Sequence, residues 1–201
     1  MTSTPVSEKE QKQIDKFANA VEGLISKDNK RCEKWKSKML HSSPILVFML
    51  KELKKVGVEF TPNHVVCTPC DASRAGGFAP NLGKVVLCEN MLVDKSHLED
   101  TLAHEFVHAY DHATINLNWN NKRHLACSEI RAANLSGECR FTKEVRRGYL
   151  GLAKQQQSCV KRRAILGLLQ GGCKTRQEAE EAVRSVWDSC FYDNTPFDEV
   201  Y

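Results

Sequence analysis

His104, Glu105 and His108 form the pattern H-E-x-x-H, and no other residues in this sequence indicate their chemistry so clearly. Positions i and i+4 lie one turn apart on a helix, so the two imidazoles project side by side toward one metal ion. Zinc held in this way keeps a position open for water, and the adjacent carboxylate takes a proton when that water attacks a carbonyl group. The pattern therefore predicts one zinc ion per chain, with His104 and His108 as ligands and Glu105 as the catalytic base.

The third metal ligand has four candidates in the sequence, which are Asp111, His112, His124 and Glu129. Asp111 lies about 10 Å along the helix axis from His104 at 1.5 Å per residue, so it is better placed to orient His108 than to bind the ion. His112 has the same problem of reach. A ligand from the next predicted helix is more natural, and we favour Glu129 over His124 because it lies in the middle of that helix.

His124 and Arg131 have two interpretations each. His124 is suited to stabilising the oxyanion of a reacting carbonyl, and Arg131 to holding a carboxylate near the site. Both are equally well explained as ordinary surface or capping groups. The sequence leaves these alternatives open.

The elements that position these residues are readable from hydrophobic periodicity and capping patterns. The capping box Ser96-x-x-Glu99 predicts a helix to about Thr114, and a second helix follows over residues 125–135. Short apolar pieces before them predict a small sheet of three or four strands at 58–60, 64–67, 77–78 and 84–88. Further helices are predicted at 7–25, 33–40, 44–55, 160–169 and 179–187. Because strands and helices are grouped rather than alternating, the fold class is α+β.

Composition limits what kind of protein this is. The chain has 201 residues, 41% of them hydrophobic and 27% charged, which is typical of one globular domain with a helical appendage. The longest apolar run, Ile45 to Leu50, is far shorter than the roughly 20 residues that span a bilayer. The first residues resemble neither a secretory signal nor a transit peptide. The net charge of +4 is small and interleaved with acids, so basic clusters such as Lys161-Arg162-Arg163 are expected to be solvated helix faces, and nucleic acid is not expected as a partner.

Nine cysteines are many for a chain of this length. Disulfides, a structural metal or buried thiols all explain such a number. Cys67-x-x-Cys70 has no second C-x-x-C to complete a zinc knuckle and no surrounding βαβ pattern for a thioredoxin-like role, so disulfides are preferred. An odd count leaves at least one cysteine unpaired within the chain, and the connectivity is not readable.

Longer stretches of the sequence resemble one family, the mitochondrial inner membrane metalloproteases that mature ATP synthase subunit 6. The resemblance covers roughly residues 30–201. It is carried by the run from His104 through Trp119 to Gly137, and by Cys32-Glu33-Lys34-Trp35, Cys67-x-x-Cys70, Gly76-Gly77-Phe78, Leu87-Cys88-Glu89-Asn90, Cys159 to Ala164 and Asp193 to Glu199.

This resemblance implies a zincin-like core in a metallopeptidase domain over residues 30–201, preceded by a helical extension over residues 1–29. It implies a zinc-dependent endopeptidase attached peripherally to the inner membrane on its intermembrane-space side. Its substrate would be the precursor of ATP synthase subunit 6, whose presequence it would remove, and it would assist assembly intermediates of the ATP synthase membrane sector. Import into an oxidising compartment would explain many disulfides without a cleaved targeting sequence.

Two functions from other classes remain as alternatives. One is an assembly chaperone whose work needs no proteolysis, and the other is a DNA-repair adaptor of the Ku complex, to which related animal proteins have been linked. Gly76-Gly77-Phe78 suits an edge strand to which an extended substrate adds as a further strand, but it is equally well explained as a glycine bulge.

Overall fold

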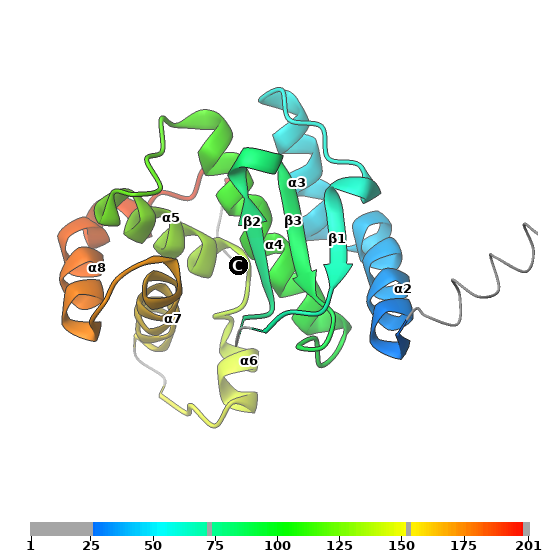
Figure 1. The fold of residues 1–201 in the computed structure, drawn as a ribbon. Helices are drawn as coiled ribbons and strands as arrows, with labels where there is room; N and C mark the ends of the chain where they lie inside the picture. Colours follow the sequence, from blue (N-terminus) through cyan, green and yellow to red (C-terminus); the bar gives the residue numbers. More distant parts are fainter. Residues whose placement is uncertain (1–25, 72–73, 152–153, 199–201) are drawn as a thin grey trace, which may run out of the picture.

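The computed structural model describes residues 26–71, 74–151 and 154–198, and these form a mixed α+β fold (Figure 1). In Figure 1 the three-stranded sheet faces the viewer, with α3 and α4 behind it, α2 to its right and α5, α7 and α8 to its left. The predicted fold class is confirmed, since a small mixed sheet is followed by a helix that carries H-E-x-x-H and is flanked by further helices. The helix predicted at 7–25 lies outside the described residues.

The first two helices are α2 (Lys27–Ser42) and α3 (Pro44–Lys55). Ser43 separates them because its hydroxyl accepts a hydrogen bond from the backbone N–H of Leu46 at 3.4 Å, and Pro44 needs no donor at the first helical position. Gly57 follows α3 with a φ of 87°, which only glycine adopts easily. The prediction for α3 is confirmed residue by residue, whereas α2 is longer at both ends than predicted.

The sheet consists of β1 (Val65–Thr68), β2 (Gly76–Ala79) and β3 (Lys84–Cys88), in the spatial order β1-β3-β2. Strand β3 pairs in parallel with β1 and antiparallel with β2. The strand predicted at 58–60 is wrong, because these residues lead instead into a short 3-10 turn over Pro62–His64. A second such turn, Pro80–Leu82, joins β2 to β3, and β2 is left as an edge strand.

The sheet packs on α4 (Lys95–Thr114), the helix that carries the histidines. Its N-cap is Asp94, whose carboxylate accepts the backbone N–H of His97 at 2.8 Å, so the predicted capping box at Ser96 is wrong by two residues. Twelve side chains of α4 are buried, among them Glu105, His108 and Asp111. A helix this deeply buried holds its polar residues in fixed positions, because each must find a partner inside the protein.

The remaining helices are α5 (Lys122–Leu135), α6 (Phe141–Arg146), α7 (Gln155–Gly171) and α8 (Arg176–Phe191). Asn121 caps α5, and Thr175 caps α8 by accepting the backbone N–H of Glu178. Both α7 and α8 extend beyond their predicted ends. Helix α6 was not predicted, because its six residues are too few to show a hydrophobic period.

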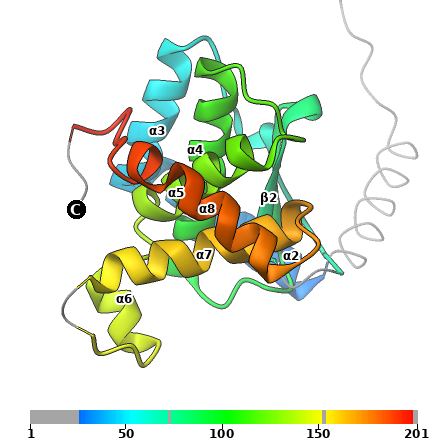
Figure 2. The same cartoon turned by 90° about the vertical axis from the view of Figure 1, so that its left-hand side faces the viewer.

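Buried side chains form two separate hydrophobic clusters. The N-terminal core lies between α2, α3, the sheet and α4, while the C-terminal core lies between α5, α7 and α8. Helix α5 faces both, because Ala132 and Leu135 belong to the N-terminal core and Ala126, Ile130 and Ala133 to the C-terminal one. Figure 2 shows α7 and α8 crossing in front of α5 on the C-terminal side.

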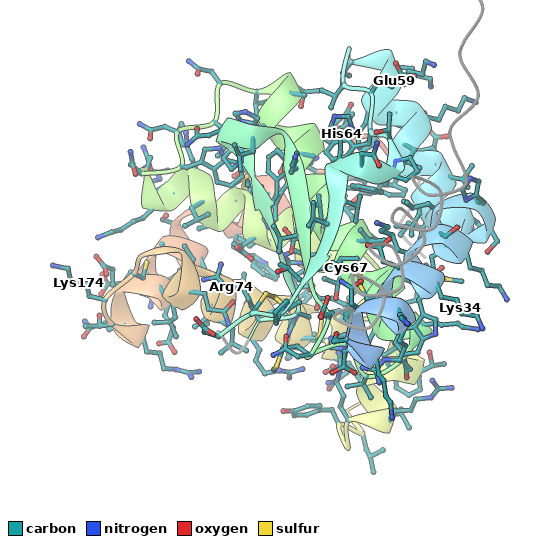
Figure 3. The ribbon with its side chains drawn as sticks, turned by 45° about the vertical axis from the view of Figure 1, so that its right-hand side comes forward. Lys34, Glu59, His64, Cys67, Arg74 and Lys174 are labelled. Carbon is teal, nitrogen blue, oxygen red and sulfur yellow. A yellow bond between two sulfur atoms is a disulfide. The ribbon has the colours of Figure 1, made fainter. Side chains whose placement is uncertain are left out.

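Each core has two disulfides of its own. Cys32–Cys67 joins α2 to β1 and Cys70–Cys88 ties the end of β1 to β3, with Cys67 at the side of the sheet next to α2 (Figure 3). On the other side, Cys127–Cys190 joins α5 to α8 and Cys139–Cys159 ties the segment after α5 to α7. The predicted disulfides are confirmed, and the odd cysteine is Cys173, which is buried and free.

No helix among the described residues is long and apolar enough to cross a membrane. The predicted division of the chain at residue 30 stays a prediction, because most of the proposed extension lies outside the described ranges.

Candidate active site

A cleft of about 600 Å³ lies between the two cores. Its walls come from β2, α4 and the loop carrying Trp119 on one side, and from α5, α7 and the segment around Glu138 and Arg147 on the other. His104, Glu105, His108 and Glu129 all line it. The cleft therefore brings together residues from both halves of the molecule at one place.

His104, His108 and Glu129 each offer one ligand atom, and these three atoms lie within 4.8 Å of one another. The two Nε2 atoms are 3.1 Å apart, and the Glu129 carboxylate oxygens lie 3.6 Å from Nε2 of His104 and 3.7 Å from Nε2 of His108. Two imidazoles and one carboxylate are a ligand set that zinc takes in peptidases, with a fourth position left for water. The three groups therefore fit a zinc ion by their chemistry and by their convergence.

His108 is oriented through a chain of hydrogen bonds. Its Nδ1 lies 2.8 Å from the hydroxyl of Ser128, which in turn donates to Asp111 at 2.9 Å. Because the hydroxyl hydrogen goes to the carboxylate, Ser128 accepts the Nδ1–H of His108, and the Nε2 lone pair is left free for a metal. Asp111 also accepts from Nε of Arg131 at 3.0 Å. Asp111 thus reaches His108 through Ser128 rather than directly, in contrast to the direct contact expected from helical geometry.

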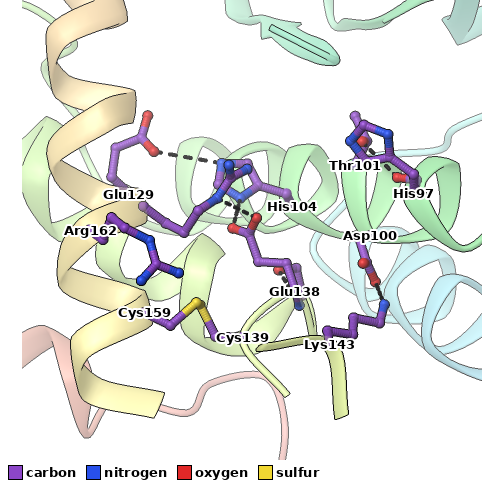
Figure 4. Close-up of polar contacts among 12 residues, drawn as sticks. His97, Asp100, Thr101, His104, Glu129, Glu138, Cys139, Lys143, Cys159 and Arg162 are labelled. Carbon is purple, nitrogen blue, oxygen red and sulfur yellow. Dashed lines mark hydrogen bonds and ion pairs between the residues drawn. A yellow bond between two sulfur atoms is a disulfide. The ribbon is translucent and has the colours of Figure 1, made fainter. Parts of the chain in front are cut away.

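His104 is oriented by a second carboxylate. Its Nδ1 lies 3.1 Å from Glu138 Oε1 (Figure 4). The other oxygen of Glu138 forms an ion pair with Nε of Arg163 at 2.6 Å. The arrangement leaves Nε2 of His104 pointing at the same place as Nε2 of His108. Burial alone would raise the pKa of Glu138, but its bond to His104 and the charge of Arg163 lower it to about 2. Glu138 is therefore a fixed negative charge behind the metal ligands.

The carboxylate of Glu129 lies against helix α7 at Gly167. A methyl group added at Gly167 would overlap with the carboxylate of Glu129, so this side chain can keep its place only beside a glycine. Gly76 on β2 is constrained by backbone as well, because a Cβ there would lie 2.6 Å from Cγ2 of Thr101 and 2.9 Å from the carbonyl oxygen of Val86. Both glycines let neighbouring elements close around the site.

Glu105 lies in the cleft beside the histidines and is almost completely buried, with 6% of its surface exposed. Burial raises its pKa to about 7, in spite of the opposing effects of His104 and of a hydrogen bond with the backbone of Phe78. A carboxylate with a pKa near 7 exchanges protons readily at neutral pH. The bond to Phe78 also shows that Glu105 lies directly beside edge strand β2.

The electrostatics of the cluster favour a cation. Burial alone would lower the pKa of His104, but hydrogen bonds with Glu129 and Glu138 raise it well above its usual value. The pKa of His108 is lowered by burial to about 4, so this ring is neutral, as a metal ligand must be. The carboxylates thus attract positive charge to the point where the Nε2 atoms meet.

The other candidates for the third ligand lie elsewhere. His124 is exposed in the first turn of α5, where its Nδ1 accepts the backbone N–H of Asn118 at 3.2 Å. His112 accepts from the indole N–H of Trp119 at 3.3 Å, and its ring packs near Phe78.

Arg131 binds Asp111 and also the Asp193 carboxylate at 2.6 Å, so it ties α4 and α5 to the C-terminal segment.

Several residues that complete the site were missed in the sequence analysis, namely Ser128, Glu138, Arg163 and Gly167. A glycine inside the apolar helix pattern at Gly167 is a weak signal of close packing that was open to use. The other three had no signal, because Ser128 and Glu138 contact the histidines from 20 or more residues away in sequence, and Arg163 reaches the site only through its ion pair with Glu138.

Two histidines and a carboxylate that could hold a cation, beside a buried glutamate in a cleft bordered by an edge strand, are typical of metallopeptidases. The predicted peptidase activity of the metallo type is confirmed by comparison with known sequences. The chain belongs to the peptidase M76 family, whose model matches residues 30–198.

Curated relatives cover most of the chain. It is 48% identical over 177 residues to the mitochondrial inner membrane protease atp23 of Aspergillus niger, which is 87% of this chain and 74% of the relative. It is 47% identical over 172 residues to the protein of the same name from Yarrowia lipolytica, covering 85% of this chain and 68% of that one. No solved structure matches the chain. The family resemblance found in the sequence is therefore confirmed.

Proposed function

We propose that this protein is a zinc-dependent endopeptidase with His104, His108 and Glu129 as zinc ligands. The observation that carries the proposal is the convergence of these three side chains from the two halves of the molecule, at 3.1 to 3.7 Å from one another. Bound at this point, zinc acts as a Lewis acid toward water and the peptide carbonyl group.

Glu105 serves as the catalytic base in this proposal. Its carboxylate oxygen takes a proton from the attacking water and later delivers it to the leaving amine. Its burial and its raised pKa, about 7, support that role. Ser128 and Glu138 hold the Nδ1 protons of the two histidines, so that both Nε2 atoms stay available to the metal.

The polypeptide substrate binds along β2. This strand pairs with β3 on one edge, and its other edge has no partner strand among the described residues. An extended peptide that adds to this edge is held by main-chain hydrogen bonds and lies across Glu105. Phe78 and Trp119, which also line the cleft, supply apolar contacts for its side chains.

The physiological substrate in this proposal is the precursor of ATP synthase subunit 6, in the mitochondrial intermembrane space. Relatives named as mitochondrial inner membrane proteases support the organelle and the membrane. Four disulfides support an oxidising compartment. The chain associates peripherally with the inner membrane, removes the presequence and assists assembly of the membrane sector.

Glu105→Gln tests the peptidase. In the purified full chain, cleavage of a peptide spanning the presequence junction should fall by about 10² to 10⁴ because the general base is lost. Zinc content should be unchanged, because the side chain at position 105 is outside the ligand set. Glu99→Gln on the same helix is the matched control, since Glu99 binds Ser43 away from the cleft and should keep full activity. Wild-type cleavage by the Glu105 variant would exclude the proposed role.

The same variant separates proteolysis from assembly. Mitochondria that contain only the Glu105→Gln protein should accumulate uncleaved subunit 6. If the membrane sector still assembles in them, assembly is an independent binding function, and if assembly fails together with cleavage, it is a consequence of proteolysis.

A further inference from the structure

Helix α6 has an unusual distribution of side chains. Its only buried residue is Glu144, which is completely inaccessible. The Glu144 carboxylate is bound by Arg162 at 2.8 Å, by Arg147 at 2.9 Å and by Gln155 at 2.9 Å. Its apolar residues point the other way, since Phe141 is 50% exposed and Val145 is 38% exposed. The helix is thus attached to α7 by charges and presents its hydrophobic side chains to the outside.

The turn after α6 continues this apolar surface. Leu150 is 73% exposed and Tyr149 is 43% exposed, with the guanidinium of Arg162 lying 4.1 Å from the centre of the tyrosine ring. Four large exposed hydrophobic side chains therefore fall within ten consecutive residues. Scattered single residues of this kind need no explanation, but four of them in one short projecting segment are typical of a surface that contacts a partner.

The charges around this group are positive. Arg140 and Arg146 are exposed and make no ion pair with any residue that the structure describes, whereas Lys143 is paired with Asp100. Glu144 is the only acid between residues 140 and 151, and it is buried and neutralised. Exposed apolar side chains among unpaired cations match the interface of an anionic bilayer, where the apolar groups enter the acyl boundary and the cations meet the lipid headgroups.

The position of this surface fits a membrane-bound peptidase. Figures 1 and 2 show α6 and its following turn projecting from one end of the molecule, below the sheet and α7. Arg147, which directly follows α6, also lines the active-site cleft. Contact with a bilayer at this end places one end of the cleft beside the membrane, where a substrate leaving the lipid is within reach.

We infer that Arg140, Phe141, Val145, Arg146, Tyr149 and Leu150 form the surface through which this protein docks on an anionic phospholipid bilayer. We name this set the α6 surface. The inference deepens the proposed function and rests on it for the inner membrane, but its chemistry is independent of catalysis.

Flotation with protein-free vesicles tests the α6 surface. The full, oxidised chain is mixed with vesicles of phosphatidylcholine alone or with an added anionic phospholipid. Two double variants are compared with it, Phe141→Ser with Leu150→Ser and Arg140→Gln with Arg146→Gln. Matched controls are Leu82→Ser with Ile115→Ser, which are equally exposed elsewhere, and Arg123→Gln with Arg184→Gln.

The wild type should float with anionic vesicles and much less with neutral ones. Removing two cations should weaken partition about 25-fold, at about fivefold per charge, and raised salt should have the same effect. Removing the two apolar side chains should weaken it at least about tenfold. Controls should bind as the wild type does, and all variants should keep the wild-type melting temperature and hydrolyse a soluble peptide at the wild-type rate.

Three results would overturn the inference. These are no flotation of the wild type, flotation of both α6 variants equal to that of the wild type, or losses in the controls as large as in the α6 variants. If only inner-membrane vesicles that retain their proteins bind the chain in an α6-dependent way, the partner is a protein, and the lipid assignment is wrong. Loss of peptide hydrolysis in the Glu105→Gln protein leaves flotation unchanged, so failure of the two proposals can be told apart.

Discussion

The two cores of this protein contribute to the site in different ways. The N-terminal side supplies His104, Glu105 and His108 from about one turn of α4. The C-terminal side supplies Glu129, Ser128, Glu138 and Gly167, which come from two helices and a connecting segment. One half thus carries a compact motif, and the other half carries the groups that complete and orient it.

This difference has a physical consequence. The spacing of the histidines depends only on local helix geometry, so it survives as long as α4 is folded. The position of Glu129 depends on how α5 packs against α4 on one face and against α7 and α8 on the other. Changes on the C-terminal side should therefore disturb metal binding from a distance, whereas changes in the N-terminal core away from α4 should affect stability alone.

Removal of Glu129 is expected to have the largest effect. Glu129→Ala leaves two imidazoles as ligands, so zinc occupancy of the purified protein and peptide hydrolysis should both fall to near zero. His124→Ala is the matched control on the same helix and should keep both, because His124 is exposed and bonded to Asn118. Mass spectrometry measures the zinc content of both variants. If the His124 variant lacks zinc and the Glu129 variant retains it, the third ligand is His124 and the assignment is reversed.

The disulfides offer the next comparison. Cys32–Cys67 and Cys127–Cys190 are separated by 35 and 63 residues. By chain entropy, replacing either pair with alanine should lower the free energy of unfolding by about 4 kcal/mol. Only the second should also weaken zinc binding, since Cys127 lies two residues before Glu129. Denaturation of the metal-free proteins and zinc titration measure the two effects, and equal loss of zinc affinity in both variants would show that the halves are not independent.

Acid should destabilise the C-terminal side through Glu144. Burial alone would raise the pKa of Glu144, but Arg162, Arg147 and Gln155 lower it below its usual 4.5. The ionised form is therefore favoured by folding, and its contribution is present above pH 4.5 and lost as the pH falls toward the folded pKa. Asp100, next to the N-terminal core, has its pKa raised by burial and does not contribute in this way.

Glu144→Gln should cost about 3 kcal/mol at pH 7 and flatten the loss of stability below pH 4.5. Glu180→Gln removes an exposed pair with Arg176 and is the control, with a change within about 0.5 kcal/mol. Urea unfolding over a range of pH measures both. An unchanged pH profile in the Glu144 variant would mean that other groups control acid unfolding.

The sequence was sufficient for features that depend on neighbouring residues. Periodicity and capping patterns predicted α3 to the residue, the apolar spacing around H-E-x-x-H predicted α4, and the grouping of strands and helices predicted the α+β class. It was insufficient where a tertiary contact decided the structure. Residues 58–60 form no strand, because position in the fold overrides local preference, and Val58 and Phe60 pack against the N-terminal core instead. The start of α4 was misplaced for a local reason, since Asp94 is as good an N-cap as Ser96 and binds the backbone of His97.

The same division applies to the site. The place of Glu129 in a predicted helix favours it as a ligand, and this is local information. Which side chain orients each histidine is not local, because it depends on how α5, α7 and residue 138 pack against α4. Ser128 and Glu138 are ordinary polar residues in the sequence, and only their burial beside a ring nitrogen makes them important. Gly167 and Ser128, which a single sequence could not assign to the site, are therefore the positions where the influence of the C-terminal side on the metal can be measured.

Gly167→Ala should displace the Glu129 carboxylate while all three proposed ligand residues stay in the sequence. The added methyl group overlaps with the carboxylate, so Glu129 must move and zinc affinity should fall about a hundredfold. Gly171→Ala on the same helix is the control, because its methyl group meets only the flexible end of Leu125 and should change zinc affinity little. Titration against a competing chelator measures the zinc affinity of both variants. Equal affinities would mean that α7 shifts to accept the methyl group and Glu129 keeps its position.

Ser128→Ala should give the smallest effect, about a tenfold loss of zinc affinity. Without the hydroxyl, the Nδ1–H of His108 has no acceptor and the ring can take the other tautomer, in which Nε2 carries the proton and no longer binds metal. Nitrogen NMR of the imidazoles reports this change directly, which a loss of packing would not produce. Ser185→Ala on α8 is the control, since its hydroxyl bonds only the carbonyl of Ala182 in its own helix. If the His108 tautomer is the same in the Ser128 variant and in the wild type, the ring is oriented by packing in α4 alone. The C-terminal side would then contribute to the site through Glu129, Glu138 and Gly167, but not through Ser128.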